Sequence, residues 1–534
     1  MDKIRDFLTR IEKSQIGFGL WISTALCIIF IRDFLETAML YPSLGEIDLF
    51  HYIHVPVFYL SLLLALTILL HLFSKVEIIK VSKVSLGFLG IIILPVLIDF
   101  FVYADLLKDM DYSYIVTNLP GNFVNFFNPF FNIPGVHCGM RIEVACICIL
   151  CGFYIYIKRN NLLLSFVGAA LAFTLCFFHG SLPGLLVAFS QFLTSLFPLP
   201  KVEYLELLTM FTIGDRAVEF VTTAQLVIMV LLIAFWFWRY DKHKFKALSG
   251  NLRLSRSLHY LLLVVLGVVF NLSFYPPLAV LLKIHSLIIL MGAFFSMFFA
   301  FQFAVIINDI FDLECDKISN KNRPLAKEVF YAGEYLNIGM VYLALALFFA
   351  LGVSNTVFKI VLIFISLAFI YSSPPFRLRR FFPTASVIIG IEGVLAFLLG
   401  YLLIEQAGVS LRNLPAGMSW LLFLIFLLAG CVKDLKDIEG DRACGVYTLP
   451  VIFGEARGRK ITGLLVCISY LMASVFLARF LILGHSAFLF ILAFIFGAFN
   501  YFYIIKKDAK ENIIFLVYFI YLFFILLFLG LKSI

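Results

Sequence analysis

Two acidic segments, each at the end of an apolar stretch, carry the residues in this sequence that are best suited to chemistry. The first reads Asn308-Asp309-Ile310-Phe311-Asp312 and continues to Asp316. On a helix, Asn308, Asp312 and Asp316 fall at i, i+4 and i+8 and therefore share one face. Asp309 lies about 100° away from that face at 3.6 residues per turn. The sequence predicts a row of oxygen ligands on one side of this segment.

The second acidic segment repeats this arrangement. Asp434, Asp437 and Asp441 fall at i, i+3 and i+7, so a helix places them on one face as well. Oxygen-only ligands suit Mg²⁺, which keeps several waters and takes one or two carboxylates plus the phosphate oxygens of a substrate. Two such faces turned toward each other would hold a diphosphate through bridging metal ions. The alternative is that each segment is a solvated turn where a helix leaves the membrane.

The composition indicates an all-α integral membrane protein. The 534 residues are 63% hydrophobic and only 14% charged. A helical span needs about 20 apolar residues, and the chain offers about fifteen such windows, six in the first half and nine in the second. The stretches 114–136 and 182–198 are apolar but interrupted by Pro and Gly, which favours re-entrant or interfacial pieces over spans.

Charge distribution predicts the topology and the domains. With the N-terminus in the cytoplasm, about three quarters of the Lys and Arg residues fall on the cytoplasmic side, and both acidic segments do too. Residues 1–15 are polar and are interpreted as a retained cytoplasmic start rather than a cleaved signal. We expect a six-span module at 1–238, a basic cytoplasmic linker at 239–257 and a nine-span module at 258–534. The basic excess reflects orientation and lipid headgroups, so no nucleic acid partner is expected.

The cysteines predict neither a disulfide framework nor a redox site. The ten cysteines are scattered, mostly within expected spans. Cys148 and Cys151 form a C-x-x-C pair, but it lies in the middle of a span with no partner pair, so both are expected to be buried small hydrophobic residues.

Basic residues near the acidic segments are suited to phosphate binding. Arg323 precedes Pro324, Arg377 follows a Pro-Pro turn, and Lys433 directly precedes the second acidic segment. Arginine grips phosphate oxygens bidentately and lysine acts as a point charge. For three other basic residues an anchoring role at the membrane surface and a phosphate-binding role both stay open: Arg379, Arg380 and Lys436.

These motifs together resemble the UbiA superfamily of intramembrane prenyltransferases. The order is Asn-Asp-x-x-Asp-x-x-x-Asp, Arg-Pro-Leu, Tyr-Ser-x-Pro-Pro-x-Arg, Lys-Asp-x-x-Asp-x-Glu-Gly-Asp and Thr-Leu-Pro, within about 255–534. The resemblance implies a nine-helix UbiA-type bundle with a central cavity. It implies Mg²⁺ ligands at Asn308, Asp309, Asp312, Asp316, Asp434, Asp437 and Asp441. It implies diphosphate contacts from Asn308, Arg323, Arg377 and Lys433. It places Asp312, Asp316, Asp434, Asp437 and Tyr371 at the reacting centre.

The implied activity is Mg²⁺-dependent transfer of a prenyl group from a prenyl diphosphate to a lipid-soluble or aromatic acceptor within the membrane. The residues of the motifs resemble those of relatives that prenylate glycerophosphate lipids, chlorins or homogentisate. A lipid-phosphate sugar as the acceptor stays open as an alternative. Ala326-Lys327-Glu328 departs from the small residue and Gly that follow Arg-Pro-Leu in many relatives, so the acceptor is not carried over. The alternative function is a polytopic transporter that uses the acidic segments as a cation or lipid-phosphate site.

The first half resembles no family that we recognise, yet it contains ionisable residues in or near its spans. Such residues mark functional candidates in membranes. They are Arg32, Asp33, Glu36, Asp99, His137, Arg141, Glu143, His179, Asp215, Arg216 and Glu219. A second catalytic site, a lipid-handling or partner-binding role and a structural role stay open for this module.

Overall fold

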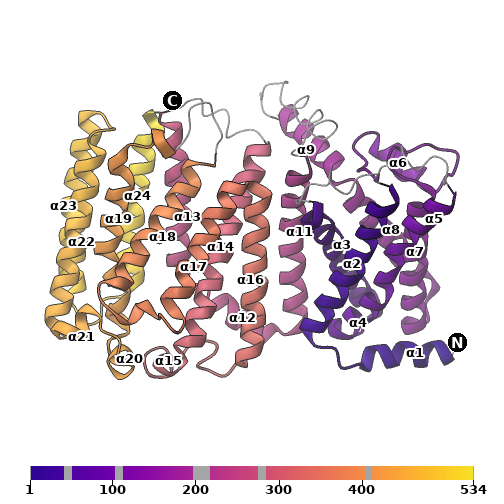
Figure 1. The fold of residues 1–534 in the computed structure, drawn as a ribbon, viewed down its shortest axis with the longest axis horizontal. Coiled ribbons are helices and arrows are strands. Elements are labelled where there is room, and N and C mark those ends of the chain that lie inside the picture. Colours follow the sequence, from indigo (N-terminus) through magenta and orange to yellow (C-terminus); the bar gives the residue numbers. More distant parts are fainter. Residues whose placement is uncertain are drawn as a thin grey trace. The chain divides into compact units, whose positions relative to one another are not determined.

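The computed structural model describes residues 2–40, 51–102, 112–196, 217–274, 284–403 and 411–532. Within these ranges the chain is helical, and the only β contact is an isolated bridge between Phe381 and Tyr447. Fifteen of the described helices are long and apolar enough to cross a membrane, six before residue 241 and nine after it. The all-α, multi-pass class and the predicted numbers of spans are therefore confirmed (Figure 1).

Contacts divide the chain into two compact units, Met1–Phe245 and Lys246–Ile534. The division falls inside the hydrophilic stretch that was expected to link two modules. This stretch is helical, because α12 (Lys242–Gly250) occupies its middle, between the end of α11 and the start of α13. The assignment of 1–238 and 258–534 as separate modules remains a prediction.

The helices of the N-terminal unit pack around several small apolar clusters. Their bounds are α1 (Asp2–Lys13), α2 (Phe18–Leu40), α3 (His51–Ser74), α4 (Ile78–Phe88), η2 (Leu89–Ile93), α5 (Leu94–Val102), α6 (Leu119–Val124), α7 (Cys138–Arg159), α8 (Leu162–Gly180), α9 (Leu182–Leu196) and α11 (Ala217–Tyr240). The polar helix α1 runs across the ends of the spanning helices of this unit (Figure 1). Leu8 anchors it in a buried cluster, and Glu12 pairs with Lys158 at 2.7 Å. The pieces at 114–136 and 182–198 contain the short helices α6 and α9, neither of which meets the criteria for a span, as predicted.

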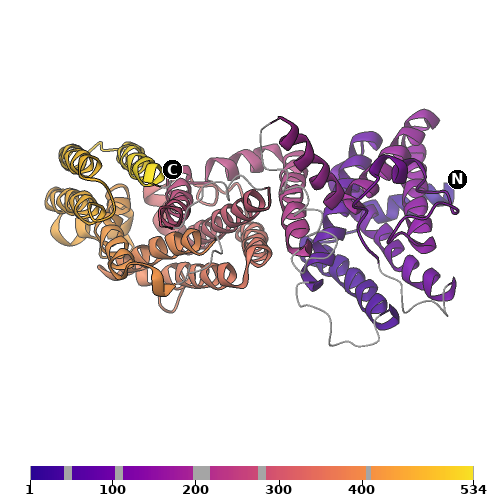
Figure 2. The ribbon, with the colours of Figure 1, turned by 90° about the horizontal axis from the view of Figure 1, so that it is seen from above.

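The helices of the C-terminal unit form the bundle that carries both acidic segments. Their bounds are α13 (Leu254–Leu272), α14 (Ile284–Phe311), α15 (Leu313–Ser319), α16 (Ala332–Val353), α17 (Asn355–Ser372), η5 (Leu378–Arg380), α18 (Thr384–Tyr401), η6 (Leu411–Asn413), α19 (Ala416–Ala429), η7 (Gly430–Lys436), α20 (Ile438–Ala443), α21 (Leu449–Phe453), α22 (Glu455–Leu477), α23 (Leu483–Ile504) and α24 (Glu511–Lys532). Several of these helices are seen nearly end-on in Figure 2. Small residues allow close packing in such bundles. At Gly400 of α18 a methyl group would collide with the backbone of Val264 of α13.

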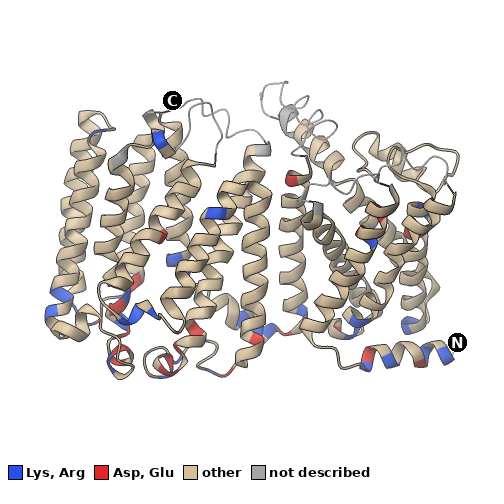
Figure 3. Ribbon diagram, in the orientation of Figure 1, with Lys and Arg blue, Asp and Glu red and all other residues tan. Residues whose placement is uncertain are grey.

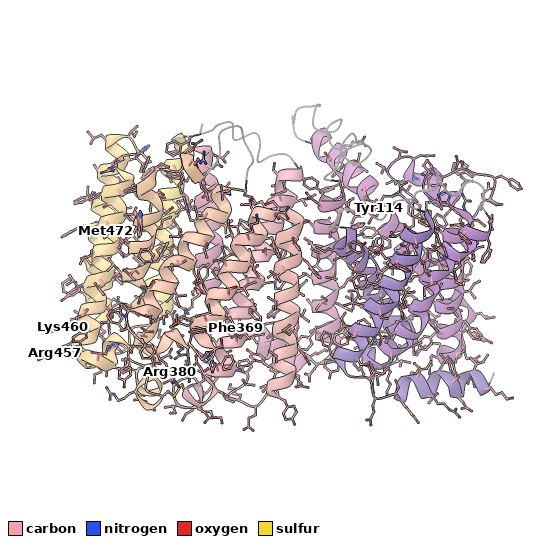
Figure 4. The ribbon with its side chains drawn as sticks, in the orientation of Figure 1. Tyr114, Phe369, Arg380, Arg457, Lys460 and Met472 are labelled. Atoms are coloured by element: carbon pink, nitrogen blue, oxygen red, sulfur yellow. A yellow bond between two sulfur atoms is a disulfide. The ribbon has the colours of Figure 1, made fainter. Side chains whose placement is uncertain are left out.

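Charged residues of the C-terminal unit gather at one end of its bundle, where α15 and α20 lie (Figure 3). Arg380, Arg457 and Lys460 lie toward this end, whereas Met472 lies further along the spans (Figure 4). The spans themselves are almost uncharged, because the hydrocarbon core of a membrane penalises unpaired charge. Loops that were predicted to share one side of the membrane therefore do share one end of this bundle.

Candidate active site

The first acidic segment lies across a break between two helices. Helix α14 ends at Phe311 and α15 begins at Leu313, so Asp312 lies between them with φ −105° and ψ 9°. The backbone still follows the helical pattern, since Asp312 N donates to Asn308 O at 2.9 Å and Asp316 N to Asp312 O at 2.8 Å. The expectation of one continuous helix is thus wrong, although Asn308 and Asp316 do line the same cavity. The buried side chain of Asp312 accepts hydrogen bonds from neighbouring residues instead of lining that cavity.

The second acidic segment is also divided. Asp434 lies in the 3₁₀ helix η7, Asp441 lies in α20, and Asp437 lies between these elements with φ −106° and ψ 12°. The i, i+3, i+7 argument assumed one α-helix and is wrong in that respect. All three carboxylates nevertheless line the cavity that Asn308 and Asp316 line.

Polar side chains of α15 and the residue after it join the two acidic segments. Asn320 donates from Nδ2 to Asp316 Oδ1 at 3.2 Å and to Asp437 Oδ1 at 2.9 Å. Ser319 Oγ accepts a hydrogen bond of 2.7 Å from the backbone N–H of Gly440. Sequence reasoning did not single out Asn320 or Ser319, because nothing in the local pattern indicates contacts with residues so far along the chain.

Arg379 makes a second bridge between the segments. Its guanidinium pairs with Asp312, and its Nη2 donates to Asp441 Oδ1 at 3.1 Å. Arg377, predicted to contact the diphosphate, donates from Nη2 to Asp312 Oδ1 at 3.1 Å and to Phe311 O at 2.9 Å. Of the two roles left open for Arg379, a simple anchor at the membrane surface does not account for a bridge between both acidic segments.

A disulfide joins Cys315 of α15 to Cys444, the residue directly after α20. The expectation that the cysteines form no disulfide is wrong for this pair. Each of these cysteines follows an acidic segment or lies within one, and the approach of the two segments brings the sulfurs together. Helix packing of this kind is not readable from cysteine spacing. The eight remaining cysteines are free thiols.

Asp309 is enclosed by donors and does not line the cavity. Its carboxylate accepts from Asn251 Nδ2 at 2.7 Å and from the Tyr335 hydroxyl at 3.0 Å. It also pairs with Arg253 and, at 3.1 Å, with Arg323. These contacts use both carboxylate oxygens, so Asp309 orients two arginines at the cavity rim instead of facing the cavity. Arg253 had been counted only as part of the basic linker.

Lys433 and Tyr371 form a pair at the same rim. The Lys433 ammonium donates to the Tyr371 hydroxyl and lies 5.1 Å from the centre of its ring. It also pairs with Asp434 at 3.0 Å. This arrangement holds a positive charge between the second acidic segment and an aromatic face, as a cation–π contact.

The cavity has a volume of about 280 Å³ and is amphipathic. Its charged rim is lined by Arg253, Arg256, Asp316, Asn320, Arg323, Arg379, Lys433, Asp434, Asp437 and Asp441. Its remaining wall is largely apolar or aromatic, with side chains such as Leu263, Phe301, Leu421, Leu422 and Phe426. A molecule with a polyanionic head and an apolar tail matches both parts.

The acidic residues alone do not make a metal site. In the described part of the chain, no three His, Cys, Asp or Glu side chains are placed to hold a metal ion together. Burial raises the pKa of Asp316 to about 6 and that of Asp441 to about 7, while the adjacent Arg323 and Arg379 guanidiniums oppose the rise. The oxygen-only donor set fits Mg²⁺ when phosphate oxygens complete its coordination, which is the usual mode for this ion.

Comparison with known proteins finds a family match within the C-terminal unit. Residues 278–528 match the UbiA prenyltransferase family, the family that the motifs of this part of the chain resemble. The match begins within the C-terminal unit and covers most of the nine-span bundle that surrounds the cavity.

Several curated relatives are proteins named digeranylgeranylglyceryl phosphate synthase. The protein of Methanocaldococcus jannaschii is 30% identical over 166 residues, which are 30% of this chain and 54% of that protein. The protein of Methanopyrus kandleri is 31% identical over 165 residues, 29% of this chain and 54% of that protein. The protein of Thermococcus sibiricus is 28% identical over 214 residues, 39% of this chain and 69% of that protein. The chain thus spans little more than half the length of several relatives that it matches.

Solved structures with a similar fold were also found. A UbiA homologue from Archaeoglobus fulgidus bound to GPP and Mg²⁺ is 20% identical, with a TM-score of 0.43, and covers 54% of this chain and 99% of that one. A structure described as digeranylgeranylglyceryl phosphate synthase in membranes is 20% identical, with a TM-score of 0.38, and covers 55% of this chain and 99% of that one.

Polar residues of the N-terminal unit form a separate hydrogen-bond network. Arg32 and Glu36, two of the ionisable candidates, pair with each other one helical turn apart. Asp99 accepts from Tyr112 Oη and from Gly139 N, both at 2.7 Å. The Asp99 contacts join α5 to the start of α7.

Another sequence candidate, Arg141, and a histidine that the sequence did not single out, His54, also make polar contacts in this unit. Arg141 donates to the carbonyl oxygens of Asn128 and Phe131. His54 contacts the Tyr114 hydroxyl, which lies near one end of this unit, at 2.8 Å (Figure 4). Asp215 and Arg216 lie outside the described residues.

Proposed function

We propose that this chain is an intramembrane prenyltransferase that takes a prenyl group from a prenyl diphosphate and joins it to a lipid-soluble acceptor. The observation that carries the proposal is the amphipathic cavity, in which the two acidic segments, bridged by Asn320 and Arg379, face an apolar and aromatic wall. The match of the bundle to the UbiA prenyltransferase family supports the same conclusion.

The rim residues would grip the diphosphate and hold Mg²⁺. Asn308, Asp316, Asp434, Asp437 and Asp441 are the oxygen donors at the cavity wall that are suited to this ion. When bound, Mg²⁺ neutralises phosphate charge and acts as a Lewis acid on phosphate oxygens. Asp312 and Asp309 belong to the same machinery through the arginines that they orient.

Chain residues supply the remaining stabilisation. Arg323, Arg379 and Lys433 line the rim and each pair with a carboxylate, and a diphosphate entering the rim would offer these cations a second set of oxygens. Arg377, which was expected to contact the diphosphate, is not among the residues that line the cavity and pairs with Asp312. Preorganised positive groups of this kind stabilise the charge that develops on a departing diphosphate. The Tyr371 ring faces the same region and would stabilise an allylic cation, while the apolar wall excludes water.

The acceptor that we propose to test first is a glyceryl phosphate lipid. The names of the curated relatives describe a glyceryl phosphate that carries two geranylgeranyl groups. The motif residues of this chain resemble those of relatives with glycerophosphate, chlorin or homogentisate acceptors, which is consistent with that choice.

We also propose that the acidic end of the bundle faces the cytoplasm. The support is the asymmetric distribution of Lys and Arg over the loops, which sets orientation in multi-pass proteins. On the same basis the N-terminus is assigned to the cytoplasmic side.

The test is an assay of purified protein in nanodiscs with labelled geranyl and geranylgeranyl diphosphates, Mg²⁺ and a membrane-lipid extract. Mass spectrometry of a Mg²⁺-dependent labelled product identifies both the activity and the acceptor. Asp312→Ala or Asp434→Ala should abolish product formation while membrane insertion is retained. Full activity in both variants contradicts the site, and the absence of any Mg²⁺-dependent prenyl diphosphate binding favours the transporter alternative.

A further inference from the structure

A buried carboxyl group lies in the apolar part of the cavity and is not among the residues proposed to bind the diphosphate. Glu392 of α18 is 8% exposed and lines the cavity wall. The hydroxyl of Tyr260 of α13, which also lines the cavity, donates to Glu392 Oε2 at 2.8 Å. No hydrogen-bond partner of Oε1 is found in the part of the chain that the structure describes. A carboxyl group at such a depth is costly to bury, which marks it as a functional candidate.

The position of Tyr260 and Glu392 within the bundle follows from where each lies along its helix. Both helices begin at the charged rim, because Arg253 immediately precedes α13 and Arg379 lies just before α18. At 1.5 Å per residue, Tyr260 lies about 9 Å and Glu392 about 12 Å into the bundle from those helix starts. The pair therefore lies inside the bundle, near the level of Tyr371 and Lys433, with both of which Glu392 interacts electrostatically.

Packing fixes the pair in this position. Helices α13 and α18 approach closely enough at Gly400 and Val264 that no side chain fits between their backbones. The Tyr260 ring also packs against Phe301 and Phe364, with ring centres 5.1 and 5.2 Å apart. Tyr260 is thus held by aromatic neighbours while its hydroxyl holds one oxygen of Glu392, and the other oxygen is left for a molecule in the cavity.

We infer that Glu392 is the residue that accepts the proton of the acceptor, and that the acceptor reacts through a hydroxyl group. This inference rests on the proposed prenyl transfer and names its missing base. The bond between C1 of the prenyl group and the diphosphate oxygen breaks, and the diphosphate leaves with the electron pair. The acceptor oxygen forms a new bond to C1, and its proton moves to the Glu392 carboxylate. The products are a prenyl ether, diphosphate and a protonated Glu392, which returns the proton to water after product release.

Position supports this role over that of a diphosphate ligand. The carbon that reacts is bonded directly to the diphosphate, so it lies just below the rim when the head group is held there. Lys433 and Tyr371 mark that level, and Glu392 is close enough to Lys433 to interact with it electrostatically. Tyr260 does not touch the reacting atoms in this scheme and is a positioning residue.

The experiment compares Glu392→Gln with wild type and with a matched control, Glu314→Gln, whose side chain is 79% exposed. Single-turnover transfer is measured from labelled geranylgeranyl diphosphate to geranylgeranylglyceryl phosphate with Mg²⁺. Binding of geranyl S-thiolodiphosphate is measured in parallel. We expect E392Q to lower the transfer rate by about 10²- to 10⁴-fold, the usual contribution of a positioned base, with unchanged binding of the thiolodiphosphate. E314Q is expected to behave as wild type.

Two further measurements keep the inference open to refutation. Glu392→Asp should recover part of the lost rate, and wild-type protein should not react with the same lipid after its free hydroxyl has been methylated. Transfer by E392Q within about threefold of wild type, or reaction of the methylated lipid, overturns the inference. If E392Q does not fold, Tyr260→Phe tests the inference instead. A transfer rate of Y260F equal to that of wild type would rule out a Glu392 base oriented by Tyr260. If wild-type protein binds no prenyl diphosphate, the proposed function fails instead.

Discussion

Asn320 and Asp437, 117 residues apart in sequence, are joined by a hydrogen bond of 2.9 Å from the side-chain amide to Oδ1 of the carboxylate. The same amide also holds Asp316 at 3.2 Å. Because one donor serves a carboxylate from each acidic segment, the two segments form a single polar surface and not two independent turns.

Removal of this donor should lower the affinity of the whole polar surface for a prenyl diphosphate. Asn320→Ala takes a hydrogen bond from two carboxylates, and a hydrogen bond to a charged group contributes about 1.5–3 kcal/mol. We therefore expect Mg²⁺-dependent affinity for a prenyl diphosphate to fall by about 10- to 100-fold, as measured by equilibrium binding. The control is Lys317→Ala, which removes an exposed side chain of α15 that pairs with exposed Glu314. Equal affinity for the two variants would show that Asn320 does not organise the site.

Neighbouring arginines give a sharper comparison. Arg379 bridges Asp312 and Asp441, whereas the Nε of Arg380 is buried without a hydrogen-bond partner in the described structure. Loss of one partner from a buried ion pair costs about 3–5 kcal/mol. Arg379→Ala should reduce prenyl transfer by more than about 100-fold in a steady-state assay, while Arg380→Ala should change it several-fold at most. A larger loss in R380A than in R379A contradicts the bridge.

The approach of α15 to α20 depends on a residue without a side chain. At Gly440 a Cβ would collide with Ser319 Oγ and lie 2.9 Å from the carbonyl oxygen of Cys315. Gly440→Ala should separate the two helices, lower the midpoint of thermal unfolding and weaken Mg²⁺-dependent ligand binding. At Gly333 of α16 a Cβ meets nothing within 4 Å, so Gly333→Ala is the control. A G440A protein with wild-type binding and stability would mean that the close approach is not required.

These contacts also indicate which features of the fold and of the candidate site can be predicted from the sequence. Apolar windows and Lys and Arg placement predicted the span count and the shared end of the loops, because a membrane requires internally satisfied backbone groups and penalises charge. The local spacing around Asp312 and Asp437 predicted continuous helices, but both helices break there, where the side chains are held by distant partners.

The unpredicted residues share one property. Arg253, Asn320 and Glu392 contact partners that are far away in the sequence. Such long-range contacts produce no periodic pattern in a single sequence, so they could not be predicted from it. Only Arg379 had a usable local signal, since it lies two residues after Arg377 in a Pro-fixed turn. The disulfide between Cys315 and Cys444 likewise follows from helix packing and not from spacing.

That disulfide leads to a stability prediction. It links two segments that are otherwise joined by hydrogen bonds and ion pairs, and a disulfide typically stabilises a fold by about 2–4 kcal/mol. Cys444→Ser should lower the midpoint of thermal unfolding in detergent by several degrees, and reductant should have the same effect on wild type. Cys27→Ser, which removes an exposed free thiol, serves as the control. Identical midpoints for C444S and wild type under oxidising conditions would contradict a stabilising link.

The most direct test of the central claim is equilibrium binding of geranyl S-thiolodiphosphate to purified protein, with and without Mg²⁺. The claim is that both acidic segments hold one diphosphate through one shared surface. We predict Mg²⁺-dependent binding that is lost in Asp316→Asn and lost equally in Asp437→Asn. Binding that does not require Mg²⁺, or that survives in either variant, would contradict a single site built from both segments.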